Sequence, residues 1–545
     1  MDTTRRRILL TGAAAATLPR VAIGQSDRRP TVTVAVQKIC NSNTLDDLRE
    51  QSNVGTRLST FFVERLIDLD YQGQLQMKPG LATAWRRIDD RTVELDLRQG
   101  VKMHNGDAFT AEDVVASFGP GRMFGDTHPT SQGKTLPLSG SQVTTNRTKD
   151  LPREVPPVGR RLWPALDHVE AVDRYKVRFV NATPDVTMEG RISCRGSGII
   201  SHRAFEEAAS WLDYARAPVG TGPYKVREFR PDVSLTMDAH DEYWGGRPPI
   251  RTLKLVEVPE TSARINGLLT GQYQFACDIP PDQIAAIEGH AGFEVQGGTI
   301  PNHRLTTFDM NHPTLRDPRV RLAMAHAIDR KTIVDSLWSG RTVVPAGLQW
   351  PFYGQMFVQG WTVPELDPAK SRELLRQAGY KGDAIPYRLL NNYYTNQVAN
   401  GQVLVEMWQQ VGLNVEIGMK ENWSQILARG ADRGIRDWSN SAPFNDPVSS
   451  IVSQHGPNGE QQQYGEWTNA EMNTLSYELE TSTDRARRHA IFARMLQICE
   501  REDPAYTVLH QNATFTAKPK SIAGWKAAPS FALDFRAANW ATQAG

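Results

Sequence analysis

The chain has 545 residues, of which 40% are hydrophobic and 23% charged, and its formal net charge is +1. A chain of this length exceeds one compact core and predicts two or three lobes. The balanced charge provides no basic field, so nucleic-acid binding is not expected.

The first 25 residues read as an export signal. Arg5, Arg6 and Arg7 precede an apolar run from 8 to 18 and a stretch of small residues near 22 to 24, the three regions of a signal peptide. The adjacent arginines favour the twin-arginine route over general secretion. Removal of 1–25 leaves a net charge of −2. No later run reaches the roughly 18 to 20 apolar residues of a membrane span, so we expect a protein free in the periplasm, without membrane insertion.

Residues 31 to 118 predict strands and one capped helix. Residues 31 to 36, TVTVAV, are a β-type run expected to be the first strand of a buried sheet. Val93, Leu95 and Leu97 alternate with charged residues, as in a half-exposed strand. Thr110 and Asp113 have the spacing of a capping box and predict a helix beginning between them.

Residues 119 to 164 are rich in Gly, Pro, Ser and Thr and exceed the usual loop length. They predict a lid or a surface loop, whose role the sequence does not specify. The run HPTSQGKT at 128–135 ends like a phosphate loop, but His128 stands where the first Gly belongs and no strand precedes it. Nucleotide binding is therefore not expected there.

Two glycine-containing turns follow. GTGPY occupies 220–224 and YWGG occupies 243–246. Glycines at such positions permit positive φ angles and close approach of another backbone segment. Each turn borders a run that alternates as a strand does.

Residues 308 to 351 predict a pair of helices. Asp317 precedes Pro318, the combination expected at an N-cap and first helical position. An apolar stripe follows and indicates one buried face, formed by Val320, Met324, Ala327 and Ile328. Three arginines lie mostly off this stripe and are expected on the solvent-exposed face: Arg319, Arg321 and Arg330. Gly340 is the natural C′ residue of the second helix.

The last third of the sequence contains further helix caps and strand patterns. Asp367 and Pro368 cap a helix that closes at Gly379. Residues 402 to 417 predict a helix and a strand, and 506 to 512 predict a returning strand. Between them, 434 to 452 contains Trp438 among Asp and Asn residues.

Together these motifs carry a family resemblance. MN, DPRVR, AIDR, IV and SG within 310–340 resemble the signature of the large solute-binding proteins of bacterial peptide and nickel ABC importers, solute-binding protein family 5. TAEDVV, GTGPY, YWGG and DPAK match in the same order, so the resemblance covers nearly all of 31 to 540. It implies an α/β, three-lobed periplasmic binding protein (type II, cluster C) with a hinge between two main lobes.

The resemblance also implies lobe boundaries. Lobe I is expected from 31–68, 205–300 and 505–545, lobe II from 69–204, and lobe III from 301–504. The chain crossings near 300 and 505 would form the hinge. Closure about this hinge would bury a ligand between lobes I and III.

Trp438, Asn440, Asn445, Asp446 and Asn311 are the candidate ligand-binding residues. The loop 434–452 occupies the position of the family's ligand-facing loop, although a Trp packed under a polar turn is the alternative for Trp438. Peptide-binding members commonly hold the ligand's ammonium with an Asp a few residues after this Trp, but Ser441, Ala442 and Pro443 stand there. Asp446 is the better replacement than Asp437, since Pro447 restricts its backbone to extended conformations.

The implied function is capture of a solute, a peptide above all, in the periplasm and its delivery to an inner-membrane ABC permease complex by a monomeric protein. The alternative is a non-peptide solute such as an oligosaccharide, an opine or a metal chelate. We expect no reaction, cofactor or resident metal, because no GxSxG, HExxH, Walker or dinucleotide motif is present. An exported hydrolase is the competing class. Its candidate histidines His303, His312, His455 and His510 are better explained as surface or hydrogen-bonded residues.

Four cysteines are widely spaced, at Cys40, Cys194, Cys277 and Cys499. In an oxidising compartment they allow three complete pairings, among which the sequence does not choose. Buried thiols with at most one disulfide are the favoured interpretation.

Overall fold

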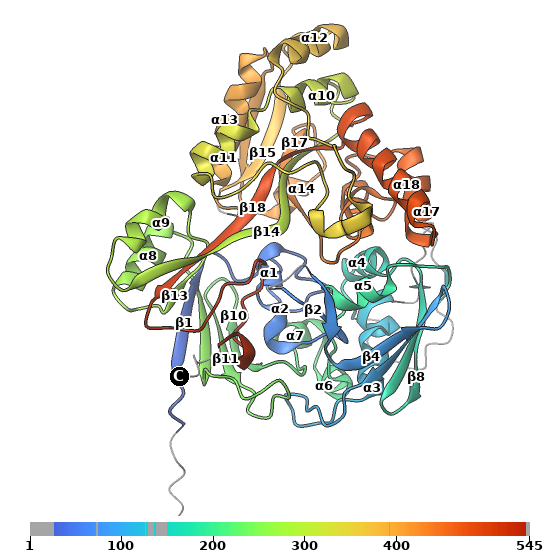
Figure 1. Cartoon of the computed structure of the whole chain (residues 1–545), viewed down its shortest axis with the longest axis vertical. Helices are drawn as coiled ribbons and strands as arrows, with labels where there is room; N and C mark the ends of the chain where they lie inside the picture. The colour runs from blue at the N-terminus through green and yellow to red at the C-terminus, as the bar shows by residue number, and fades with distance from the viewer. Residues whose placement is uncertain are drawn as a thin grey trace, which may run out of the picture.

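The computed structural model describes residues 27–540 except 72–74, 126, 129–135, 138–149 and 392. The expected export signal and most of the phosphate-loop-like run therefore lie outside the described residues. Within them, the chain forms three bodies, two below and one above in Figure 1. We call these the lower left, lower right and upper bodies.

One ten-stranded sheet joins the lower left and upper bodies, in the order β10-β11-β12-β1-β13-β18-β14-β17-β15-β16. Its first strand in the sequence, β1 (Thr31–Val36), pairs in parallel with β12 and β13, which confirms the predicted buried strand. The other strands are β10 (Tyr224–Arg230), β11 (Ser234–Ala239), β12 (Thr252–Glu257), β13 (Phe275–Ala276), β14 (Phe293–Phe308), β15 (Ile385–Leu390), β16 (Val415–Lys420), β17 (Ile435–Ser441) and β18 (Tyr506–Pro519).

β14 and β18 are the long strands that cross between the two bodies. They pair antiparallel along almost their whole lengths, and their register shifts between Thr299 and His303. At this point the Gln511 side-chain amide donates to the Ile300 carbonyl at 2.9 Å. This irregularity lies at 299–303 of β14 and faces 511–513 of β18. The hinge crossings near 300 and 505 stay predictions. The division into lobes at the boundaries given above stays a prediction.

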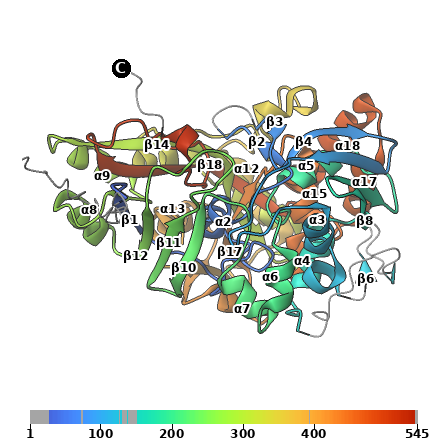
Figure 2. The same ribbon diagram turned by 90° about the horizontal axis from the view of Figure 1, so that it is seen from below.

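The lower right body is built on a four-stranded sheet in the order β4-β5-β9-β8. Figure 2 shows β4 and β8 at the opposite end of the molecule from β1, β11 and β12. Its core contains Val93, Leu95, Phe179 and Trp163. The elements are β4 (Ala82–Arg87), β5 (Thr92–Leu97), α3 (Ala111–Ser117), η1 (Pro120–Phe124), α4 (Val155–Leu162), β8 (Leu166–Asp173), β9 (Lys176–Asn181), α5 (Met188–Ser193), α6 (His202–Glu207) and α7 (Trp211–Arg216).

The sequence 119–164, predicted as a lid or surface loop, is only partly described. Its two ends are helical, η1 and α4, and α4 reaches the central cavity through Arg161. Thr110 and Asp113 form the predicted capping box at the start of α3.

The lower left body adds four short helices to its half of the sheet, and two small strand pairs lie outside both large sheets. The helices are α1 (Asn53–Thr56), α2 (Ser59–Phe62), α8 (Thr261–Leu269) and α9 (Pro281–Glu288). The strand pairs are β2 (Ile67–Leu69) with β3 (Met77–Pro79), and β6 (Thr127–His128) with β7 (Leu136–Pro137).

The upper body surrounds β15, β16 and β17 with helices (Figure 1). These are α10 (Pro318–His326), α11 (Arg330–Trp338), η3 (Pro351–Met356), α12 (Pro368–Ala378), α13 (Gln397–Gln410), α14 (Trp423–Leu427), η4 (Pro447–Ser449), α15 (Ile451–His455), α16 (Glu460–Gln463), α17 (Ala470–Thr481), α18 (Arg485–Gln497) and η5 (Ile498–Glu502); η6 (Ala537–Asn539) follows β18.

The predicted helix pair is confirmed, with one correction. Asp317 caps α10, and the positive φ angle of Gly340 follows α11. Arg321 and Arg330, however, are buried, with exposed fractions of 1% and 5%. Arg321 donates to the Pro504 carbonyl and Arg330 to the Val508 carbonyl. Buried main-chain carbonyl groups require a donor, and these two guanidinium groups provide it around β18.

Asp367 caps α12 and Gly379 closes it in the left-handed conformation, as predicted. The two glycines of GTGPY are needed because another backbone segment lies close to them, and neither has a positive φ angle. A Cβ atom on Gly220 would lie 2.3 Å from the Phe62 carbonyl oxygen, and one on Gly222 would lie 2.4 Å from that of Phe61. Both glycines therefore let α2 pack against the turn before β10.

Candidate functional site

A cavity of about 340 Å³ lies where the three bodies meet. Its lining comes from segments far apart in the sequence: 41–56, 65–75, 161–162, 194–195, 300–301, 393–394, 423–464 and 530–531. Its volume falls in the range of small-ligand sites.

An aromatic wall closes the upper side of the cavity and is formed by Tyr393, Tyr394, Trp423 and Trp438. The rings of Tyr393 and Trp423 meet edge to face at 4.9 Å between centroids, and those of Trp423 and Trp438 do so at 5.0 Å. Edge-to-face contacts of this kind fix ring orientation. The wall is therefore a rigid apolar surface.

Strand β17 positions Trp438 because alternate residues of a strand point to opposite faces. The Arg436 guanidinium lies 4.0 Å above the Trp438 ring and is itself held by Glu466 through hydrogen bonds of 2.6 and 2.7 Å. The buried ion pair thus supports one face of the indole, while Trp438 still lines the cavity.

Next to the wall lies a polar floor, defined by Ser439, Asn440, Ser449, Ser450 and Gln454. The Asn440 amide donates to the Ser450 carbonyl at 3.1 Å and to the Gln454 side-chain oxygen at 2.6 Å. The Asn440 Oδ1 and Gln454 Nε2 atoms are buried without a partner among the described residues. Buried polar atoms of this kind ordinarily find a partner, so this floor can accept a further hydrogen bond at Asn440 Oδ1 and donate one from Gln454 Nε2.

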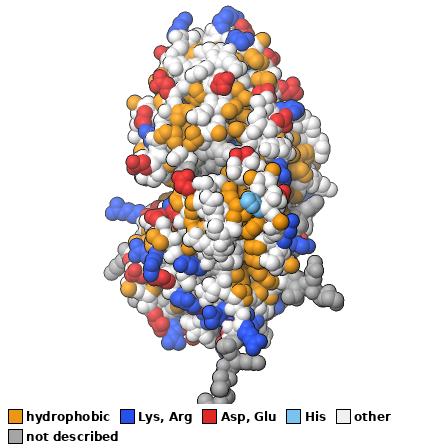
Figure 3. All heavy atoms as spheres, turned by 90° about the vertical axis from the view of Figure 1, so that its left-hand side faces the viewer, with side chains coloured by type: hydrophobic (Ala, Val, Ile, Leu, Met, Phe, Trp, Pro, Cys, Tyr) orange, Lys and Arg blue, Asp and Glu red, His pale blue; other side chains and the backbone are white. Residues whose placement is uncertain are grey.

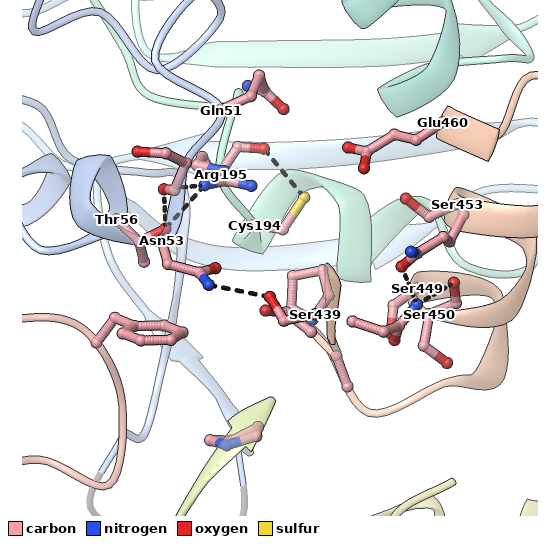
Figure 4. A pocket seen from close by; sticks show the side chains of 18 of the residues that line it. Gln51, Asn53, Thr56, Cys194, Arg195, Ser439, Ser449, Ser450, Ser453 and Glu460 are labelled. Carbon is pink, nitrogen blue, oxygen red and sulfur yellow. Dashed lines mark hydrogen bonds between the residues drawn. The ribbon is translucent and has the colours of Figure 1, made fainter. Parts of the chain in front are cut away.

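Arginines also line the cavity, and Figure 4 shows one of them, Arg195, across from Ser449 and Ser450. Arg195 donates to the Ser52 carbonyl at 2.7 Å and to the Thr56 hydroxyl at 2.8 Å. Arg161 forms an ion pair with Glu460 and donates to Gln51 at 2.8 Å. Burial lowers the pKa of Arg161 to about 10.

Several contacts join the upper body to the lower bodies around this cavity, among them the following side-chain pairs. Asn53 donates to the Ser439 hydroxyl at 3.0 Å (Figure 4). Arg161 of α4 pairs with Glu460 of α16. Arg191 of α5 pairs with Glu480 of α17 at 2.6 Å. The bodies are thus in contact on both sides of the cavity.

Two of the five predicted binding residues, Trp438 and Asn440, line the cavity, and Asn445, Asp446 and Asn311 do not. The Asp446 carboxylate accepts two hydrogen bonds of 2.9 Å from Arg488 and caps η4 through the Val448 amide. The extended backbone before Pro447 therefore directs it to α18 rather than into the cavity. Asn311 is exposed and donates to Asp309 and to the Gly465 carbonyl.

Most of the lining was missed by sequence reasoning. Tyr393, Tyr394 and Trp423 are consecutive or isolated aromatic residues without a periodic pattern, and Arg195 follows a short helix. The paired tyrosines at 393 and 394, on a loop before α13, could have given a signal, since ligand pockets are lined mainly by hydrophobic and aromatic side chains.

The other candidates lie elsewhere. None of His303, His312, His455 and His510 is among the lining residues. Burial lowers the pKa of His303, His455 and His510 to about 3, so these three rings are neutral. All four cysteines are buried and free, and Cys194 lines the cavity.

No group of three or more His, Cys, Asp or Glu side chains in the described residues is placed to hold a metal ion. None of their helices has the length and apolar character needed to cross a membrane.

Comparisons with known proteins show the family of this chain. Residues 76–460 match the family described as bacterial extracellular solute-binding proteins, family 5 Middle. The dipeptide-binding protein of Escherichia coli K12 is 24% identical over 484 residues, which are 84% of this chain and 85% of that protein. The glutathione-binding protein of Shigella flexneri serotype 5b is 24% identical over 460 residues, 81% of this chain and 82% of its own.

A solved structure shows the same fold. The dipeptide-binding protein of Pseudoalteromonas sp. SM9913 in complex with Met-Leu superposes with a TM-score of 0.80 at 19% identity, covering 93% of this chain and 99% of that one.

Proposed function

Because this chain belongs to the bacterial extracellular solute-binding proteins of family 5, we propose that it captures a small solute, a peptide above all, for an ABC importer. The α/β, type II binding-protein fold expected from the sequence is confirmed. The relatives found are binding proteins, not enzymes.

The observation that carries the proposal is a single cavity enclosed by all three bodies, with its polar floor and aromatic wall on one body and its arginines on the other two. A site divided in this way is complete only when the bodies are together. Solute binding would therefore favour the closed arrangement, because contacts to both sides form only there.

The crossing of β14 and β18 supports hinge motion as the closing step. Only two strands pass between the lower left and upper bodies in the described sheet, and their ladder is irregular at 299–303. Outside these strands the bodies meet through side-chain contacts such as Asn53 with Ser439, and through a main-chain hydrogen bond of 3.0 Å from the Val186 amide to the Glu480 carbonyl. Hinge opening would separate these contacts. A closed form would offer an inner-membrane permease a surface that the open form lacks.

Residues 1–25 support a site of action in the periplasm, with export of the folded chain by the twin-arginine route. We propose that the protein acts there as a monomer.

A non-peptide solute is the second candidate, and one observation favours it. Asp437 and Asp446, the acids near Trp438, are both held by arginines, Arg304 and Arg488. Neither is available for a peptide ammonium, while the serine-rich floor offers hydroxyl groups to a polar solute. An exported hydrolase lacks support, since the candidate histidines lie outside the cavity.

Native mass spectrometry of protein purified gently from periplasm tests the proposal. We expect a retained small solute whose mass identifies it. Protein that retains none, and that no peptide stabilises against heat, would contradict solute capture.

A further inference from the structure

The charge of the cavity lining is unbalanced. Four arginines line it, Arg49, Arg65, Arg161 and Arg195, against two glutamates, Glu50 and Glu460. Glu460 is paired with Arg161. Glu50 accepts hydrogen bonds of 2.7 Å from the Asn41 and Ser42 amides and another from the Ser42 hydroxyl. Both carboxylates are therefore engaged by the protein itself.

Arg195 differs from the other three arginines. Two hydrogen bonds, to the Ser52 carbonyl and the Thr56 hydroxyl, fix its Nη1 atom. Its Nε and Nη2 atoms have no hydrogen-bond partner among the described residues, and it forms no ion pair with any of them. Figure 4 shows its side chain beside Thr56 and Asn53 on the rim opposite Glu460 and Ser453.

A partly buried guanidinium without a carboxylate partner is unfavourable, because burial removes water from its Nε–H and Nη2–H groups and no acceptor among the described residues replaces that water. Burial lowers the pKa of Arg195, and the more distant Asp47 and Glu50 oppose this only in part. Two free N–H groups on one planar guanidinium have the geometry that binds a carboxylate through two hydrogen bonds.

We propose that Arg195 anchors a carboxylate of the bound solute, and that the cavity selects solutes by this anion and not by an ammonium group. The inference rests on the proposed function and names its substrate class: small carboxylates whose remaining atoms pack on the aromatic wall. No lining carboxylate is left for an ammonium, because Glu50 and Glu460 are engaged and Asp437 and Asp446 lie outside the lining.

Three forms of one dipeptide test both claims, that the solute's carboxylate is required and that its ammonium group is not. Calorimetry with Met-Leu, its C-terminal amide and N-acetyl-Met-Leu compares the loss of the carboxylate with the loss of the ammonium. We expect amidation to weaken binding at least tenfold, since it removes the charged partner of Arg195. We expect acetylation to change affinity by less than threefold.

The Arg195→Gln variant should bind Met-Leu and its amide within threefold of each other. Arg195→Lys retains the charge and provides a second variant should the glutamine protein melt early. Arg216→Gln, which removes an exposed arginine of α7, is the matched control and should keep the full preference for the acid.

The outcomes separate the two proposals. Equal binding of acid and amide, or a tenfold loss on acetylation, would overturn the anion inference and leave solute capture intact. If Met-Leu does not bind, the solute retained from periplasm decides: a carboxylic acid supports the inference and a solute without one overturns it. Absence of both binding and a retained solute contradicts solute capture itself.

Discussion

At the residue scale, Asp446 shows how a local sequence argument can place a backbone well and a side chain badly. Pro447 does hold the Asp446 backbone extended, at φ −144° and ψ 141°. The carboxylate nevertheless turns to Arg488, a residue of α18 that no local pattern connects to it. Burial raises the pKa of Asp446, and the pairing with Arg488 opposes this.

We expect Asp446→Asn to destabilise the protein by about 3 kcal/mol, because Arg488 would stay buried without its counter-charge. The affinity for a solute should change less than threefold. Urea unfolding measures the loss of stability, and calorimetry measures the affinity. In the double variant Asp446→Asn/Arg488→Met the loss should be smaller than the sum of the single losses. A tenfold loss of affinity at unchanged stability would restore Asp446 as a ligand residue.

The predictable residues were those whose role depends on near neighbours. Asp317 and Asp367 each precede a proline and cap the helix that follows. Trp438 and Asn440 were identified through the family's loop position. Arg195 and Trp423 could not be identified from the sequence, because each becomes a lining residue only when the three bodies meet. Arg321 was misplaced for the same reason: its carbonyl partner lies in a distant segment.

At the element scale, the turn before β10 depends on glycine because the α2 backbone lies against it. We expect Gly220→Ala to lower stability by about 2 kcal/mol, since the new Cβ would overlap the Phe62 carbonyl and a backbone shift would follow. The urea midpoint measures the loss. Gly418→Ala on β16 is the control, because no atom lies within 4 Å of its Cβ position. Equal midpoints for the two variants would show that the turn can relax.

The junction of α5 and α17 predicts a pH dependence. Burial raises the pKa of Glu480 to about 7, with Arg191 opposing and Asp185 and Asp446 adding to the rise. If opening exposes Glu480, its pKa falls back towards 4.5. The closed form then gains its full stabilisation at low pH and loses it as pH rises through 7.

We therefore expect the affinity for Met-Leu to fall about tenfold between pH 5.5 and 7.5. Calorimetry in buffers of different ionisation enthalpy should also show proton uptake on binding. The Glu480→Gln variant should lose both effects. A pH dependence that survives in this variant would assign the proton to another group.

At the scale of the whole molecule, solute binding should compact the protein. Small-angle scattering should show a smaller radius of gyration after addition of the solute identified by mass spectrometry. The melting temperature should rise as well, because a ligand at 100 times its Kd stabilises the folded state by about 2.7 kcal/mol. Tight binding without a change of radius would contradict hinge closure.

The proposed export also concerns the whole chain. Replacement of Arg5, Arg6 and Arg7 by Lys should stop export of the folded protein, because the twin-arginine route requires the arginines themselves. Cell fractionation measures the periplasmic amount. Normal levels would indicate the general secretory route.

The side-by-side crossing of β14 and β18 has an evolutionary consequence. Leu305 and Val508 are paired neighbours in the sheet, so the chain enters and leaves the upper body at adjacent points. A segment bounded in this way can be exchanged as a module, because its two ends already match the spacing of one strand pair, about 4.8 Å. Recombination there would replace the aromatic wall and the polar floor together and retain Arg195 below. New solute preferences could thus arise by the shuffling of one continuous gene segment.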